Sequence, residues 1–235
     1  ENFPINGVED NRENHYAFSN AKIFVDYKTV IENGTLIIKN GKIVSVGQNI
    51  SIPRGVKVFN LNGKYIYPSF IDLYTDYGIV KKKRNNQGGE LSYFMSYMSP
   101  KMESDKLGPY GWNGAIKAEY NVVENVKVDE KKSKQLRDIG FGSVVSHNMD
   151  GIMRGSGALL SLSDNKEQDI VLKQKSSAHY SFIKGTSAQN YPNSLMGSVA
   201  LLKQSFYDAD WYKSEFNSGQ VNLTLQSINQ SKNLP

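Results

Sequence analysis

Few side chains of this sequence are suited to acid–base or metal chemistry. It contains three histidines, His15, His147 and His179, and no cysteine. The lack of cysteine excludes disulfides, cysteine nucleophiles and thiolate metal sites. A lone histidine is more often a hydrogen-bonded structural residue than a ligand, and we interpret His15 in that way.

The other two histidines lie beside predicted strands. His147 ends a strand predicted over residues 142–147, and Asp150 follows three residues later. Catalytic residues of barrel enzymes gather at such strand ends, so His147 and Asp150 are candidates for a pocket. His179 and Lys184 flank a strand predicted over residues 178–183, and both are weaker candidates because no local motif identifies either as a ligand.

Two further stretches have a functional and a structural interpretation. Residues 154–157, Arg-Gly-Ser-Gly, suggest a phosphate cradle, but the Gly-Lys-Ser/Thr ending is missing and a tight turn is favoured. An aromatic segment could bind sugar or peptide, although such rings more often fix a long loop to its domain. Its members are Tyr93, Phe94, Tyr97, Tyr110 and Trp112.

The charge distribution gives little indication of a nucleic-acid partner. The formal net charge is +5, and the densest basic run is Lys-Lys-Lys-Arg at residues 81–84. No RNA-stacking motif or zinc-finger spacing accompanies that run, so we predict a solvated loop and no nucleic-acid binding. No apolar stretch reaches the ~18 to 20 residues of a membrane helix, and no transmembrane segment is predicted.

The elements that must position these residues begin with short β runs. Strands are predicted over residues 21–25, 35–39, 42–47 and 56–59, with a two-residue hairpin turn at Asn40-Gly41 because both residues tolerate positive φ. Residues 65–73 form an almost continuous apolar run, which predicts a strand buried on both faces. Residues 78–124 are rich in Gly, Ser, Asn and Tyr, and we expect a long irregular excursion there.

Helices are expected to alternate with strands later in the chain. Asp129 is a predicted N-cap for a charged helix that Gly140 closes. Strands follow over residues 142–147, 156–162 and 178–183. Ser194 opens an amphipathic helix, and a last helix covers residues 221–232 before Pro235.

Two stretches, residues 37–47 (IIKNGKIVSVG) and 63–76 (GKYIYPSFIDLYTD), resemble the opening of the metal-dependent amidohydrolase superfamily. In that family a small β-sandwich precedes a (β/α)8 barrel, whose first strand carries proline, usually glycine, then phenylalanine or leucine, isoleucine, aspartate and His-x-His. The matching residues are Pro68, Phe70, Ile71 and Asp72, while Ser69 replaces the glycine. Residues 110–113, 136–145 and 150–155 resemble exported bacterial members related to imidazolonepropionase.

Tyr74 and Asp76 occupy the two histidine positions of this motif. In the family, neutral imidazoles there hold zinc or another divalent cation, which lowers the pKa of a bound water to near ~7. Phenols ordinarily lose their proton only near pH ~10, and a single carboxylate does not make a hydrolytic zinc site. The resemblance therefore implies that the metal motif is degenerate, and we expect no metal or other cofactor in this chain.

The resemblance implies an α/β fold in two parts: a β-sandwich-like unit over residues 1–63 and a partial barrel over residues 64–235. A complete (β/α)8 barrel takes ~250 residues, so we predict an incomplete one. It would pair with the remainder of a longer polypeptide or with another copy of the chain. The lack of cysteine and the exported relatives favour a periplasmic or otherwise exported location.

Three hypotheses of function stay open. The first is a catalytically silent segment of an amidohydrolase-like hydrolase of carbon–nitrogen bonds. The second is an active metal-dependent enzyme, acting on cyclic amides or similar bonds, that residues outside this chain complete. The third is a ligand-binding or structural module.

Overall fold

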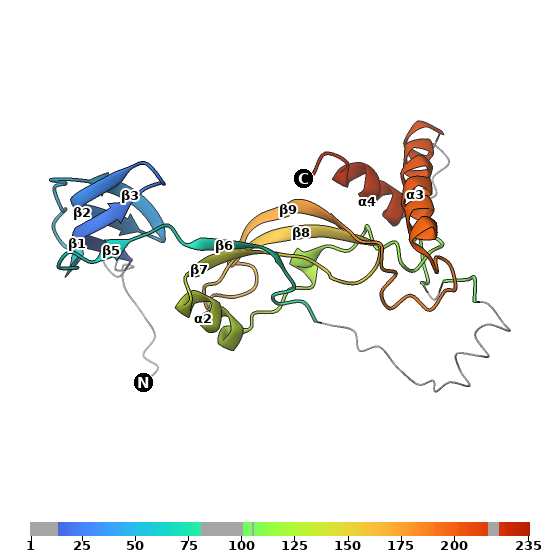
Figure 1. Ribbon diagram of the computed structural model, residues 1–235, viewed down its shortest axis with the longest axis horizontal. Coiled ribbons are helices and arrows are strands. Elements are labelled where there is room, and N and C mark those ends of the chain that lie inside the picture. Colours follow the sequence, from blue (N-terminus) through green and yellow to red (C-terminus); the bar gives the residue numbers. More distant parts are fainter. Residues whose placement is uncertain (1–13, 81–100, 105, 216–220) are drawn as a thin grey trace, which may run out of the picture. The chain divides into compact units, whose positions relative to one another are not determined.

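The computed structural model describes residues 14–80, 101–104, 106–215 and 221–235. The chain divides into two compact units, residues 1–69 and 70–235 (Figure 1). Each unit has its own sheet. Two predicted features, the basic run at residues 81–84 and the aromatic residues Tyr93, Phe94 and Tyr97, lie outside the described residues.

The first unit is a sheet of five strands. They are β1 (His15–Phe24), β2 (Val30–Lys39), β3 (Lys42–Gly47), β4 (Lys57–Asn60) and β5 (Tyr65–Ile66). The order is β3-β2-β1-β4, and β5 also pairs with β1. Strand β1 is antiparallel to β2 and parallel to β4 and β5. Its small core centres on Ala21, Ile23 and Leu36, so the β-rich N-terminal part predicted from the sequence is confirmed.

The hairpin turn between β2 and β3 is confirmed at the predicted residues. Lys39 pairs with Lys42, and Asn40 and Gly41 between them have φ of 51° and 73°. Two consecutive positive φ angles define the turn whose twist matches that of the flanking strands.

Replacing Gly41 by alanine should destabilise the first unit by about 1 kcal/mol, because an L side chain strains this conformation. No atom lies within 4 Å of the position that the new Cβ would take, so strain of the backbone is the whole effect. Urea unfolding followed by far-UV circular dichroism measures it. Asn40→Gly is the matched control and should be neutral or slightly stabilising; an equal loss in both variants would contradict this account.

The second unit is built on a four-stranded sheet. Its strands are β6 (Phe70–Thr75), β7 (Phe141–Ser146), β8 (Met153–Ser161) and β9 (Val171–Tyr180), in the order β6-β7-β8-β9. Strand β6 runs parallel to β7, whereas β7, β8 and β9 form an antiparallel meander. Tyr77, Val144 and Leu160 belong to the main core cluster beneath this sheet.

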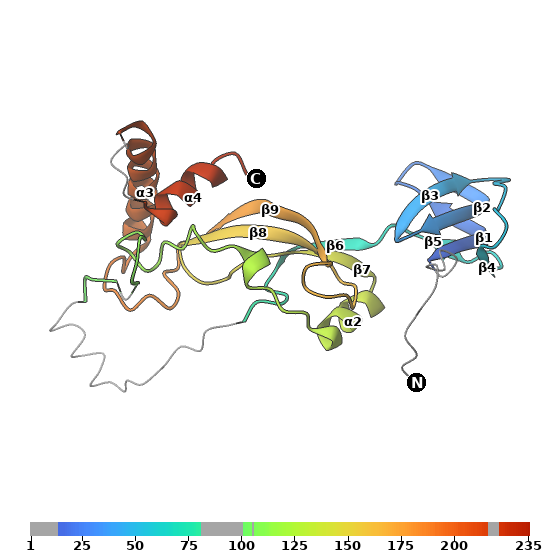
Figure 2. The same cartoon turned by 180° about the vertical axis from the view of Figure 1, so that it is seen from behind.

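The helices lie where the sequence places them. Helix α2 (Glu130–Asp138) begins after Asp129, whose side chain accepts a hydrogen bond from the Lys132 amide, and Gly140 follows its end with φ of 100°. Helix α3 (Leu195–Glu215) and helix α4 (Leu223–Ser231) pack against each other, as Figure 2 shows from behind. A 3-10 turn, η1 (Val122–Glu124), is the one helical segment among the described residues of the predicted excursion. None of the helices in the described ranges has the length and apolar character needed to cross a membrane.

Three predictions about strands are wrong. The apolar run at residues 65–73 is not one buried strand: it is divided between β5 and β6, and Phe70, Ile71 and Leu73 are each more than half exposed. In the described part of the chain β6 pairs only with β7, and its apolar side chains are only partly covered, Phe70 by the ring of Phe141. The strand predicted over residues 178–183 ends at Tyr180 and begins at Val171. Strands β7 to β9 are joined without intervening helices, contrary to the predicted alternation.

Candidate functional site

Four polar side chains come together at the sheet of the second unit, from the four strands or their ends. Tyr74 lies on β6, His147 directly follows β7, Arg154 lies on β8 and His179 lies on β9. The pairing of the strands brings these residues together although they are far apart in the sequence. We call them the four-strand cluster.

The rings of the cluster are in direct contact. The imidazoles of His147 and His179 stack with centroids 3.6 Å apart and planes 11° apart. The Tyr74 ring meets His147 edge to face at 4.5 Å. Arg154 Nη1 donates a hydrogen bond to the Tyr74 hydroxyl at 2.9 Å, and Arg154 Nε donates to the Gly151 carbonyl at 3.2 Å.

Both histidines of the cluster are uncharged near neutral pH. Burial lowers the pKa of His147; Arg154 acts in the same direction, while a hydrogen bond with the Asn148 carbonyl and the charge of Asp76 oppose it. Burial, followed by the charges of His147 and Arg154, lowers the pKa of His179 to about 4. Nδ1 of His147 lies 2.9 Å from the Asn148 carbonyl oxygen and must be the protonated nitrogen of the neutral ring, which leaves a lone pair on Nε2.

A glycine on β8 makes the contact between the two histidines possible. A Cβ on Gly157 would lie 2.8 Å from His179 Nε2 and 2.6 Å from Ser177 Oγ. The His179 ring is held by a 2.7 Å hydrogen bond to Ser177 Oγ. It therefore occupies the space that the side chain of any residue larger than glycine at position 157 would need. The Arg-Gly-Ser-Gly stretch is part of a strand and not the predicted tight turn.

The cluster is poorly suited to hold a divalent cation. The lone pairs of two stacked imidazoles lie in nearly parallel planes and do not converge on one ion, as tetrahedral or octahedral coordination requires. The guanidinium of Arg154 brings a permanent positive charge to the Tyr74 hydroxyl. Asp76, at the second motif position, is ion-paired with Lys132 at 3.4 Å.

Asp150 lies in a different set of contacts. Its carboxylate pairs with Lys117 Nζ and accepts hydrogen bonds from the Thr186 amide at 2.7 Å and the Thr186 hydroxyl at 2.5 Å. Burial raises the pKa of Asp150, but the bonds from Lys117 and Thr186 outweigh it and hold the pKa below its usual value. A Cβ on Gly185 would lie 1.9 Å from the carboxylate, so Asp150 fastens the 184–187 segment at close range.

Lys184 and Trp112, the remaining candidates, take part in fastening the irregular segments. Lys184 Nζ donates to the Gln189 carbonyl at 2.7 Å. The Trp112 ring stacks on Tyr191 with centroids 6.1 Å apart. The buried Gln189 side chain binds the carbonyls of Met102 and Trp112 and accepts from the Gly114 amide. These contacts fit the structural interpretation of the aromatic segment at Trp112.

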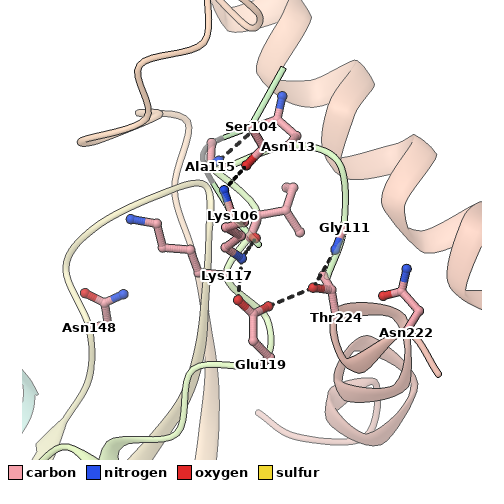
Figure 3. Close-up of polar contacts among 12 residues, drawn as sticks. Ser104, Lys106, Gly111, Asn113, Ala115, Lys117, Glu119, Asn148, Asn222 and Thr224 are labelled. Carbon is pink, nitrogen blue, oxygen red and sulfur yellow. Dashed lines mark hydrogen bonds and ion pairs between the residues drawn. The ribbon is translucent and has the colours of Figure 1, made fainter. Parts of the chain in front are cut away.

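A second polar network joins the same segments to α4 (Figure 3). Glu119 lies between Lys106, which pairs with it and also donates to the Ile116 carbonyl at 2.9 Å, and Thr224, whose hydroxyl donates to it at 2.9 Å. The Gly111 amide donates to the Thr224 hydroxyl at 3.0 Å. Glu119 also lines a polar pocket of about 150 Å³ with Lys175, Ser227 and Gln230. The carboxylate oxygens of Glu119 already have partners within the chain, Lys106 and Thr224.

Arg154 is the functional candidate that sequence reasoning misses. In the sequence it is read only with the glycines that follow it, and nothing there indicates that β8 aligns it with Tyr74, 80 residues earlier. The sequence signal for Arg154 is its position shortly after His147 and Asp150. Its contact with Tyr74 follows from the strand order, which the sequence does not specify.

No protein-family model matches the chain. It is 27% identical over 158 residues to an adenine deaminase of Lactobacillus delbrueckii subsp. bulgaricus, a match that covers 63% of this chain and 24% of that protein. Its structure matches that of an amidohydrolase from Thermotoga maritima with a TM-score of 0.63 and 16% identity, covering 92% of this chain and 55% of the other. The chain thus spans about a quarter of the one relative and about half of the other, and its fold is amidohydrolase-like.

Proposed function

We propose that this chain is a segment of an amidohydrolase-like hydrolase in which the metal position of the first barrel strand is catalytically silent. The observation that carries the proposal is the hydrogen bond from Arg154 to the Tyr74 hydroxyl. Active members need neutral imidazoles around a divalent cation. At the first of these positions this chain has Tyr74, whose hydroxyl oxygen accepts a hydrogen bond from the guanidinium of Arg154. The second position, Asp76, is neutralised by Lys132 in the same way.

The finer relationship is also a proposal. The adenine deaminase and the Thermotoga amidohydrolase support a hydrolase of carbon–nitrogen bonds in ring compounds as the ancestral activity. The stretches at residues 110–113, 136–145 and 150–155 support a subgroup related to imidazolonepropionase. Export to the periplasm is a further proposal, which rests on the resemblance to that subgroup and on the lack of cysteine.

The incomplete barrel is supported by the exposed apolar residues of β6. Phe70, Ile71 and Leu73 are 65%, 51% and 69% exposed on the strand at the end of the sheet. Apolar side chains beside an unpaired strand edge favour association with another strand. We propose that the remainder of a longer polypeptide, or a second copy of the chain, covers this edge.

Light scattering on the purified chain tests this association. We expect a mass above the 26.3 kDa of a single chain, because burial of the three apolar side chains stabilises a complex. Ile71→Lys, on the exposed strand, should shift the protein toward the monomer. A compact, stable monomer of wild-type protein at high concentration would contradict pairing with a second copy of the chain.

Metal analysis tests the silent site directly. After incubation with excess zinc and dialysis, wild-type protein should retain less than about one zinc per ten chains, since too few neutral ligands converge near Tyr74. The double variant Tyr74→His/Asp76→His is the positive control and should retain more zinc than the wild type. Stoichiometric zinc in the wild type that is lost in Asp76→Asn would overturn the proposal and favour the alternative, an active enzyme that other residues complete.

A further inference from the structure

Arg154 is a buried cation on β8. Only 8% of the residue is exposed, and its hydrogen bonds in the described part of the chain go to two neutral oxygens, Tyr74 Oη and the Gly151 carbonyl. Among the described residues no carboxylate forms an ion pair with it, whereas Arg137, in the same unit, binds Asp164 with two nitrogens. A buried charge is costly unless it is paired, so the surroundings of Arg154 favour an incoming anion.

A second polar group of the same cluster also lacks a partner. His147 is fully buried, and its Nε2 makes no hydrogen bond to any residue that the structure describes. Its other ring nitrogen is satisfied by the Asn148 carbonyl, so Nε2 is the position at which the ring can take up a proton. A buried polar atom without a partner calls for an explanation in terms of a ligand, an ion or a water.

Tyr74 is the most exposed residue of the three. It is 60% exposed, its ring contacts His147, and its hydroxyl accepts a hydrogen bond from Arg154, which leaves the hydroxyl proton free to donate. We propose that Tyr74, Arg154 and His147 form a binding site for a small carboxylate. The planar guanidinium matches the two oxygens of a carboxylate, and the Tyr74 hydroxyl supplies a further donor.

This site couples binding to proton uptake. With Nε2 unprotonated, His147 presents a lone pair and repels a carboxylate; with Nε2 protonated, it donates to one. The groups facing His147 are Tyr74 and Asp76 from β6 and its end, Arg154 from β8 and His179 from β9. Arg154 opposes protonation of His147, and a bound anion offsets that charge, so binding raises the pKa of His147 and tightens as the pH falls.

The test is a titration of the purified chain with sodium acetate at constant ionic strength, followed by the imidazole signals of His147 in NMR spectra at pH 5.5 and pH 8. We expect saturable shifts, with tighter binding at pH 5.5 and a raised pKa of His147 in acetate. Tyr74→Phe removes one oxygen from an exposed ring and should fold normally while binding acetate about tenfold more weakly, the usual effect of losing a hydrogen bond to a charged group. Arg154→Gln should abolish binding.

The controls separate a built site from general salt effects. Lys134→Gln removes an exposed cation on α2 and should leave acetate binding unchanged. Sodium chloride and sodium phosphate, titrated in the same way, should give weaker responses. Shifts that do not saturate, equal affinity for phosphate, or acetate binding that survives Arg154→Gln would each overturn the assignment. Because the titration contains no metal, failure here leaves the silent-site proposal standing, and zinc in that site would not itself produce acetate binding.

Discussion

Gly155→Ala is expected to destabilise the second unit by more than about 3 kcal/mol, enough to unfold a domain of ordinary stability. Gly155 lies within β8 with φ of 80°, a conformation that an L side chain rarely adopts. The new Cβ would lie 2.1 Å from the Tyr120 carbonyl oxygen and 2.9 Å from its carbon. These are backbone atoms, and the same oxygen accepts a hydrogen bond from the Ser156 amide at 3.0 Å, so relief of the clash breaks that contact.

Tryptophan fluorescence during urea unfolding measures this effect in the right unit, because both tryptophans, Trp112 and Trp211, belong to the second unit. Gly47→Ala lies in the first unit, where its Cβ would meet Ile50 at an ordinary distance of 3.5 Å, and it shows whether a glycine-to-alanine change outside the second unit alters the fluorescence transition. That variant should unfold at the wild-type urea concentration. A fully stable Gly155→Ala protein would show that the 116–121 segment does not lie against β8 as described.

The second large effect is a loss of stability in acid that originates at His179. Its pKa is about 4 in the folded chain, against an ordinary value of 6.5. Between those values the unfolded chain binds a proton that the folded chain does not. The contribution is therefore fully present above pH 6.5 and is lost as the pH falls toward 4, by up to roughly 3 kcal/mol.

Urea unfolding at pH 7.5, 6.0, 5.0 and 4.5, again followed by tryptophan fluorescence, tests this pH dependence. His179→Gln should flatten the fall in stability, leaving the smaller part that belongs to His147. His15→Gln, in the first unit and outside the histidine stack, should leave the pH dependence of the second unit as it is in the wild type. An unchanged slope in His179→Gln would show that the stacked, buried geometry does not hold in solution.

The local elements of the fold could be predicted from the sequence because their signals are local. The Asn40-Gly41 turn, the Asp129 cap and the Gly140 end of α2 each depend on residues a few positions apart. The burial of residues 65–73 could not be predicted in the same way. An apolar run indicates that a strand can be buried on both faces. Whether it is buried depends on the elements that pack beside it, and in the described part of the chain β6 has only β7 as a neighbouring strand.

Three members of the candidate site, Tyr74, His147 and His179, were predictable from the sequence, whereas Arg154 and the grouping of the four were not. His147 and His179 are candidates because they lie at the ends of predicted strands, and Tyr74 because of its position in the motif. Their contact depends on the strand order β6-β7-β8-β9. Asp150 seemed to belong with His147 because it is three residues away, yet it pairs with Lys117 and Thr186. Residues far apart in the sequence, such as Tyr74 and Arg154, are in contact, whereas His147 and Asp150, which are close in the sequence, have different partners. Strand pairing decides which residues become neighbours across a sheet.

The parallel pairing of β6 with β7 has a consequence for the order of folding. Strands β7, β8 and β9 follow one another through short connections and can form their meander from local contacts, whereas residues 76–140 separate β6 from its partner. Closing so long a loop costs entropy before any contact is gained, so β6 should join last and slowly. Until then β7 presents a free edge on which a strand from another molecule can pair, and refolding yield should fall as protein concentration rises.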